Sequence, residues 1–331
     1  MSERIEQLQG WLQEELGPRE YSLTLASEDA SFRRYYRFEY DGISRIVMDA
    51  PPAQEDCRPY VDIARRLRNC GVNAPEIHTA DLEQGFLLMT DLGNKLYLDV
   101  LTENNVDNLY SDALTSLVKI QQGGDQKNIP PYNEALLMKE MELFREWLLQ
   151  KHLGIKLDPQ QHAGLDQLFS FLSASALEQP RVFVHRDYHS RNLMHCKFDN
   201  PGIVDFQDAV SGPFTYDLVS LLKDCYIKWP REQVDNWAVK FYRQIRPGES
   251  DETRFLRWFE LMGVQRNLKA SGIFARLYLR DGKAGYLADI PRTLSYVLDL
   301  EQDHPELNFV IELMRSQVLP VLQKVNSTCT Q

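Results

Sequence analysis

Two short apolar segments, each followed within a few residues by acidic or amide side chains, constrain this chain more than any other feature. Residues 181–193 read RVFVHRDYHSRNL, and residues 202–206 read GIVDF. Phosphoryl transfer from a nucleotide needs an acid that accepts the substrate's hydroxyl proton, followed by an amide and a second acid that hold Mg²⁺. The pattern therefore predicts Asp187 as the catalytic base, Asn192 and Asp205 as metal ligands, and ATP and Mg²⁺ as cofactors.

Each of these three side chains has a commoner explanation when it is taken alone. Asp and Asn favour turns, strand ends and helix caps. All three at this spacing, between two apolar strands, favour the kinase interpretation. A metal cluster at His189, His195 and Cys196 is the less favoured interpretation, because no second Cys/His pair stands at zinc-finger spacing.

The segment after the second acid separates this chain from protein kinases. Residues 212–218 read GPFTYDL and follow Asp205 almost directly, so no long activation segment is left as a platform for a peptide. The motifs resemble the kinase-like superfamily, and within it the aminoglycoside phosphotransferase branch. This resemblance implies an α+β, bilobal protein-kinase-like fold with a small mixed β-sheet N-lobe, a mainly helical C-lobe and an active site between them. It also implies that His185 and Asp217 support the catalytic loop.

The composition narrows the partners. The chain has 331 residues and a net charge of −11, which argues against nucleic-acid binding and against adhesion to anionic membranes. The five cysteines are odd in number and scattered, which predicts a reduced, cytoplasmic setting. The polar start of the sequence has no signal core, and no apolar run reaches bilayer length. The resemblance implies a small-molecule sugar substrate, and we expect a monomer.

The order of predicted elements in the amino-terminal part matches a kinase N-lobe. A helical period over 5–16 precedes strand-like segments, and Asp41-Gly42 predicts a hairpin turn. A helix, two more strands and then a polar connector follow. The predicted elements are a helix at 5–16, strands at 21–26, 33–40 and 44–49, a helix at 58–70, and strands at 76–79 and 85–89. We expect a nucleotide-binding lobe at residues 1–92 and a catalytic, substrate-binding lobe at residues 93–331.

The turn that stands in the place of the phosphate-binding loop contains no glycine. Residues 27–32 read SEDASF and lead into Arg33 and Arg34. Small side chains can still let backbone N–H groups approach phosphates. Ser31, Phe32, Arg33 and Arg34 are therefore candidate nucleotide contacts, although each arginine is as well explained as a solvated strand residue.

Met48 marks a second departure from the kinase pattern. The third predicted strand should carry a lysine for the α- and β-phosphates, and Met48 stands at that position. Either an arginine replaces the lysine, or the protein binds nucleotide poorly; the intact base and metal residues favour replacement. The helix carboxylate that would pair with such a lysine stays open between Glu55 and Asp56.

The apolar strand at 86–89 leads into a polar connector that reads TDLG. In the kinase-like family this is the hinge that binds adenine, which makes Met89, Thr90 and Leu92 candidate nucleotide contacts. A buried strand followed by an ordinary turn explains the same residues equally well. An apolar slot beside a few backbone polar groups suits a nucleotide base.

The carboxy-terminal part is predicted to be mainly helical, and one helical stretch bears on the substrate. Arg266 and Lys269 lie three residues apart and should share a helix face. They could meet an anionic group or the transferred phosphate, while an ordinary basic helix face is an equal alternative. Asp208 is a further candidate substrate contact.

Three segments together are similar to one bacterial subgroup of this family. They are residues 29–37 (DASFRRYYR), 48–52 (MDAPP) and 265–269 (QRNLK). The subgroup comprises the cell-wall-recycling kinases that phosphorylate the anomeric hydroxyl of N-acetylmuramate and N-acetylglucosamine. Two alternatives stay open: a kinase of aminoglycosides or other small alcohols, and an inactive nucleotide-binding scaffold, which Met48 would favour.

Overall fold

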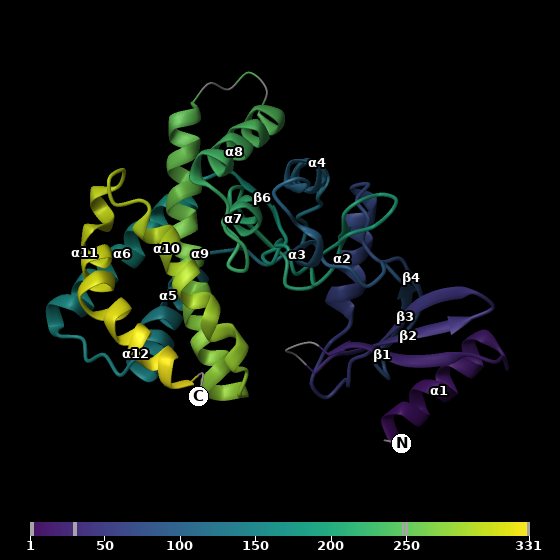
Figure 1. The fold of residues 1–331 in the computed structure, drawn as a ribbon. Helices are drawn as coiled ribbons and strands as arrows, with labels where there is room; N and C mark the ends of the chain where they lie inside the picture. Colours follow the sequence, from purple (N-terminus) through teal and green to yellow (C-terminus); the bar gives the residue numbers. More distant parts are fainter. Residues whose placement is uncertain (1–2, 29–31, 247, 249–250, 330–331) are drawn as a thin grey trace. The chain divides into compact units, whose positions relative to one another are not determined.

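The computed structural model describes residues 3–28, 32–246, 248 and 251–329 (Figure 1). The chain forms two compact units. The first comprises Met1–Asp125 with Arg191–Asp208, and the second comprises Gln126–Ser190 with Ala209–Gln331. The first unit thus extends past residue 92 and takes in residues 191–208, while the lobe boundary at residue 92 stays a prediction.

A five-stranded sheet in the order β1-β2-β3-β5-β4 forms the centre of the first unit. All neighbouring strands in this sheet pair antiparallel. The expectation of a mixed sheet is therefore wrong, because strands that follow one another in the chain pair as hairpins. The predicted Asp41-Gly42 turn is confirmed, with φ of 48° and 75°. The strands are β1 (Ser22–Glu28), β2 (Arg34–Tyr40), β3 (Ile43–Asp49), β4 (Ile77–Asp81) and β5 (Phe86–Thr90).

The two faces of this sheet carry different partners. Helix α1 (Glu3–Leu16) packs Leu8, Trp11 and Leu12 against one face. On the opposite face, Tyr60 of α2 (Arg58–Asn69) lies 3.4 Å from the sulfur of Met89. We call this α2 side of the sheet the inner face, and it carries Met89, one of the predicted adenine contacts.

The segment around the predicted metal ligands folds back onto the first unit. Strands β7 (Leu193–Met194) and β8 (Gly202–Ile203) form a two-stranded ribbon, and Gly202 also bridges to Asn73. The ring of Phe206 lies 4.7 Å from that of Tyr60. Two further helices complete the unit: α3 (Tyr97–Val100) and α4 (Val106–Gly123).

The second unit is helical apart from the pair β6 (Arg181–Val184) and β9 (Val210–Pro213). Its central element is the 30-residue helix α9 (Glu252–Asp281), which contacts α5, α6, α7, α8 and α10. Figure 1 shows α9 as the long green helix, with α5, α6 and α10 beside it. The other helices are α5 (Glu134–Leu143), η1 (Phe144–His152), α6 (Pro159–Leu177), α7 (Tyr216–Leu222), α8 (Arg231–Ile245), η2 (Ala284–Asp289), α10 (Ile290–Leu298), η3 (Pro305–Leu307), α11 (Asn308–Leu313), η4 (Met314–Val318) and α12 (Leu319–Cys329).

The predicted α+β architecture is confirmed: an antiparallel sheet with helices is followed by a mostly helical part. Within the described residues, no helix has both the length and the apolar character needed to cross a bilayer.

The close packing of α9 against the junction of α5 and η1 depends on Gly272. A methyl group at this position would overlap the backbone carbonyl of Leu143. We expect Gly272→Ala to destabilise the protein by about 1–3 kcal/mol, because one of the two helices must move. Gly10→Ala on α1, where no atom lies within 4 Å of the new methyl group, should instead stabilise it by about 0.5–1 kcal/mol. Urea unfolding checks both values; equal stability of Gly272→Ala and the wild type would contradict the packing argument.

Candidate active site

The backbone of the predicted catalytic loop is held by one buried carboxylate in the second unit. Asp217, at the start of α7, accepts the N–H groups of His185 at 2.7 Å and of Arg186 at 2.9 Å. Burial raises the pKa of Asp217 to about 7, although these two donors act in the opposite direction. Arg186 has a φ of 78°, an uncommon conformation for a residue with a side chain. Asp217 thus fixes the backbone immediately before Asp187.

Asp187 is half-buried and lies among positive charges. Burial would raise the pKa of its carboxyl group, but the charges of Lys269, His189 and Arg186 outweigh that effect and leave the pKa below its ordinary value. Its own N–H group lies 3.3 Å from Nδ1 of His185. The carboxylate is therefore ionised at neutral pH, as a proton acceptor must be.

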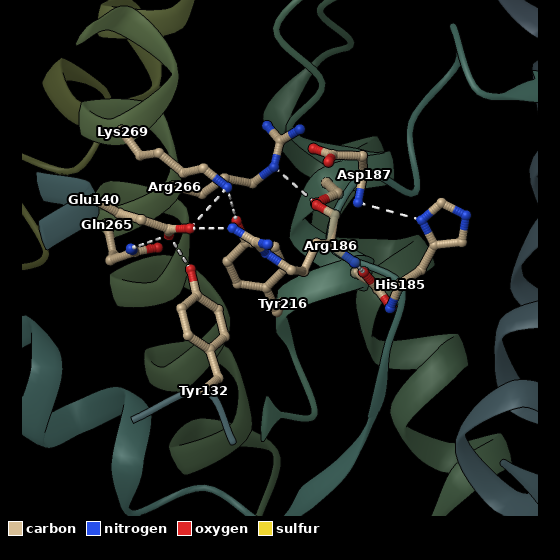
Figure 2. A network of polar contacts seen from close by, with 11 residues as sticks. Tyr132, Glu140, His185, Arg186, Asp187, Tyr216, Gln265, Arg266 and Lys269 are labelled. Carbon is tan, nitrogen blue, oxygen red and sulfur yellow. Dashed lines mark hydrogen bonds and ion pairs between the residues drawn. The ribbon is translucent and has the colours of Figure 1, made fainter. Parts of the chain in front are cut away.

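A second buried carboxylate, that of Glu140 on α5, forms ion pairs with two cations beside the loop, Arg186 and Lys269 (Figure 2). It lies 2.6 Å from Arg186 and 3.2 Å from Nζ of Lys269. It also accepts hydrogen bonds from the hydroxyl of Tyr132 and the amide of Gln265. The sequence analysis missed Glu140; an acid on the otherwise apolar face of α5 was the available signal.

Arg266 and Lys269 share the face of α9 that meets α7, as their spacing predicted. Nζ of Lys269 donates to the hydroxyl of Tyr216 at 2.9 Å. Nε of Arg266 donates to Oγ of Ser220 at 2.7 Å. Both cations are buried, and Figure 2 shows the guanidinium of Arg266 pointing toward the carboxylate of Asp187. Their role toward a substrate stays a prediction.

The predicted metal ligands meet in the first unit. Pairing of β7 with β8 places Asn192, just before β7, beside Asp205, just after β8. The amide of Asn192 donates to Oδ2 of Asp205 at 3.1 Å, and the amide of Gln207 donates to Oδ1 at 2.8 Å. Gln207 was not predicted.

The donor atoms of this pair fit Mg²⁺. One carboxylate and one amide oxygen are hard ligands, and Mg²⁺ at nucleotide sites takes only one or two protein ligands besides phosphates and water. Within residues 3–28, 32–246, 248 and 251–329, no group of three or more His, Cys, Asp or Glu side chains is placed to hold a metal. The short ligand set is therefore the kind expected for a metal shared with a nucleotide.

The predicted hinge is fixed by Asp91, which the sequence analysis also missed. Its carboxylate accepts hydrogen bonds from Arg37 at 2.7 Å and from Ser44. Burial alone would raise the pKa of Asp91, but the hydrogen bonds from Arg37 and Ser44 lower it below its ordinary value. Met89 is buried, while Thr90 and Leu92 are partly exposed at the end of β5.

The remaining candidates differ in exposure. Arg33 is buried beside Glu55, whereas Phe32 and Arg34 are exposed. Asp208 is exposed next to Gln207. Ser31 lies outside the described residues. The structure thus groups Asp187 with Arg266 and Lys269 in the second unit, and Asn192 with Asp205 in the first.

Comparison with known proteins identifies the family. Residues 22–259 match the model of the phosphotransferase enzyme family. An N-acetylmuramate/N-acetylglucosamine kinase of Pseudomonas putida is 45% identical, over 94% of this chain and 96% of that protein. Proteins of the same name from Pseudomonas aeruginosa and Neisseria meningitidis are 46% and 40% identical, over 93% and 91% of this chain and 91% and 92% of those proteins.

Solved structures agree on the fold. ADP-bound aminoglycoside phosphotransferase APH(2'')-Ib has a TM-score of 0.59 at 16% identity, covering 89% of this chain and 97% of that one. The GDP complex of aminoglycoside 2'-phosphotransferase-IIIa has a TM-score of 0.61 at 14% identity, covering 91% and 98%. With its loop motifs, its fold and nearly full-length relatives in agreement, this chain belongs to the phosphotransferase enzyme family.

Proposed function

We propose that this protein transfers the γ-phosphoryl group of ATP to the anomeric hydroxyl of N-acetylmuramate or N-acetylglucosamine in peptidoglycan recycling. The observation that carries the proposal is its 45% identity, over 94% of the chain, to a kinase named for these two sugars. The assignment includes a cytoplasmic location, a monomeric state, a nucleotide-binding lobe at 1–92 and a catalytic lobe at 93–331.

Asp187 is the catalytic base in this proposal. Its ionised carboxylate orients the sugar's 1-hydroxyl group and accepts its proton as that oxygen attacks the γ-phosphorus. Asn192 and Asp205 hold Mg²⁺, which when bound compensates the negative charge of the phosphates. His185 and Asp217 support the loop, because Asp217 accepts its N–H groups and Nδ1 of His185 lies beside the N–H group of Asp187.

The nucleotide and the sugar are assigned to separate sets of residues. The phosphates are assigned to the turn before β2 and the adenine to the hinge after β5. The nucleotide set is Ser31, Phe32, Arg33, Arg34, Met89, Thr90 and Leu92. Arg266 and Lys269 supply positive charge beside Asp187, which suits the lactyl carboxylate of N-acetylmuramate, and exposed Asp208 can accept a hydrogen bond from a sugar hydroxyl.

Release of ADP against a substrate panel tests the assignment. With ATP and Mg²⁺, we expect release with N-acetylmuramate and N-acetylglucosamine and only background release with kanamycin and choline. Activity with kanamycin or choline alone would identify a different alcohol kinase. ADP binding without turnover of any panel member would indicate a scaffold.

Asp187→Asn keeps the shape of the side chain and removes the base. We expect kcat to fall by about 10²- to 10⁴-fold, because the hydroxyl loses its proton acceptor. Asp166→Asn, at an exposed position on α6, serves as the matched control and should keep wild-type kcat. Equal kcat values for Asp187→Asn and the wild type would rule out the role as base, provided both proteins show the same thermal unfolding midpoint.

Asp217 predicts a specific dependence of stability on pH. Its pKa is about 7 in the folded protein and near 3.8 when unfolded, so the folded state binds the extra proton between these values. The stabilisation is complete below about pH 4 and is lost as the pH rises through 7, a loss on the order of 4 kcal/mol. We expect Asp217→Asn to lack this component when urea unfolding is compared at pH 5 and pH 8. The same change in both proteins would contradict the assignment.

A further inference from the structure

The inner face of the third strand provides no cation for a nucleotide's phosphates, because Arg45 of β3 lies on the same face as Val47, the α1 side. In kinases, a lysine on this strand contacts the α- and β-phosphates and pairs with a helix glutamate. Here Met48 occupies the inner face of β3, fully buried between Tyr35 and Leu87 in register. If ATP binds, its phosphates need a positive charge from another element.

Arg33 is the one buried arginine or lysine in the described part of the first unit, with 8% of its surface exposed. Its position follows from the pairing of β2 with β3. Arg34 lies opposite Asp49, and Asp49 is bonded to Arg4 of α1, so that pair is on the α1 side of the sheet. Arg33, one residue earlier, falls on the inner side with Met48. A buried guanidinium thus stands on the face where the lysine is missing.

Glu55 forms a long ion pair with this guanidinium. Its carboxylate lies 3.9 Å from Nε of Arg33 and accepts the N–H group of Phe32 at 3.4 Å. Glu55 lies shortly before α2. Arg33 and Glu55 thus form a cation–carboxylate pair like the lysine–glutamate pair of kinases, but from different positions in the chain. Its neighbour Asp56 instead pairs with Arg58, and both of those side chains are exposed.

We propose that Arg33, positioned by Glu55, contacts the α- and β-phosphates of the nucleotide and replaces the cation that Met48 cannot supply. The inference rests on the proposed ATP-dependent function. A guanidinium suits the task because it keeps its charge when buried and can bond two phosphate oxygens at once. Loss of a charge-assisted hydrogen bond of this kind reduces affinity by about 10- to 100-fold.

Calorimetric titration of the full-length protein with ADP, AMP and adenosine in Mg²⁺ tests the contact. We expect Arg33→Ala to weaken ADP binding by about 10- to 100-fold and to leave adenosine binding unchanged, because adenosine has no phosphate. The matched control Arg58→Ala removes an exposed cation, with 69% of its side chain exposed, at the start of α2. It should bind ADP like the wild type.

Glu55→Gln tests the positioning role. It should weaken ADP binding by a smaller factor, about 3- to 10-fold, and Asp56→Asn should have no effect. In the Arg33→Ala background, Glu55→Gln should add nothing, because Glu55 acts through Arg33. A purely structural role would instead weaken adenosine and ADP equally and add to the effect of Arg33→Ala.

The outcomes separate the two proposals. If the wild type releases ADP only with kanamycin or choline, the proposed sugar substrate is overturned and the phosphate contact still stands. If the wild type turns over the sugars but Arg33→Ala and Arg58→Ala bind ADP with equal affinity, only the inference about Arg33 is overturned. If Arg33→Ala has a lower unfolding midpoint than the wild type, Arg33→Gln is used in its place, because it keeps the aliphatic stem. It should likewise weaken ADP binding and leave adenosine binding unchanged.

Discussion

The carboxylate of Asp217, bonded to two consecutive backbone N–H groups, is the interaction on which the rest of the site depends. It joins the start of α7 to His185 and Arg186 and holds Arg186 in a conformation that a free chain rarely adopts. Because Asp187 is the next residue, its direction follows from this contact. Burying a carboxylate is costly unless hydrogen bonds compensate. Here the compensating donors are the backbone N–H groups of the catalytic loop.

The charges around Asp187 form a balanced set rather than a simple basic patch. Lys269 and Arg186 lower the pKa of Asp187, and both are themselves paired with Glu140. A buried cation without a partner would be strongly destabilising, so Glu140 lets two cations remain in the interior. The same arrangement keeps the base ionised at neutral pH.

Local patterns predicted much of this structure, and long-range pairing explains what they missed. The apolar segments beside the catalytic motif form β6 and β8, and the meeting of Asn192 with Asp205 follows from a short hairpin. Glu140 and Asp91 were missed because their partners lie 46 and 54 residues away, at distances that only the folded chain reveals. The pairing of Arg33 with Glu55 was out of reach for the same reason, although the missing lysine at Met48 pointed to a replacement.

The position of the new phosphate ester is the most direct test of the proposed reaction. After incubation with ATP, Mg²⁺ and N-acetylmuramate, a proton–phosphorus correlation spectrum of the product identifies the carbon that carries the phosphate. The reaction proposed for Asp187 predicts coupling of the phosphorus to the single anomeric proton. Coupling to the two protons at carbon 6, or no phosphorylated sugar at all, would contradict it.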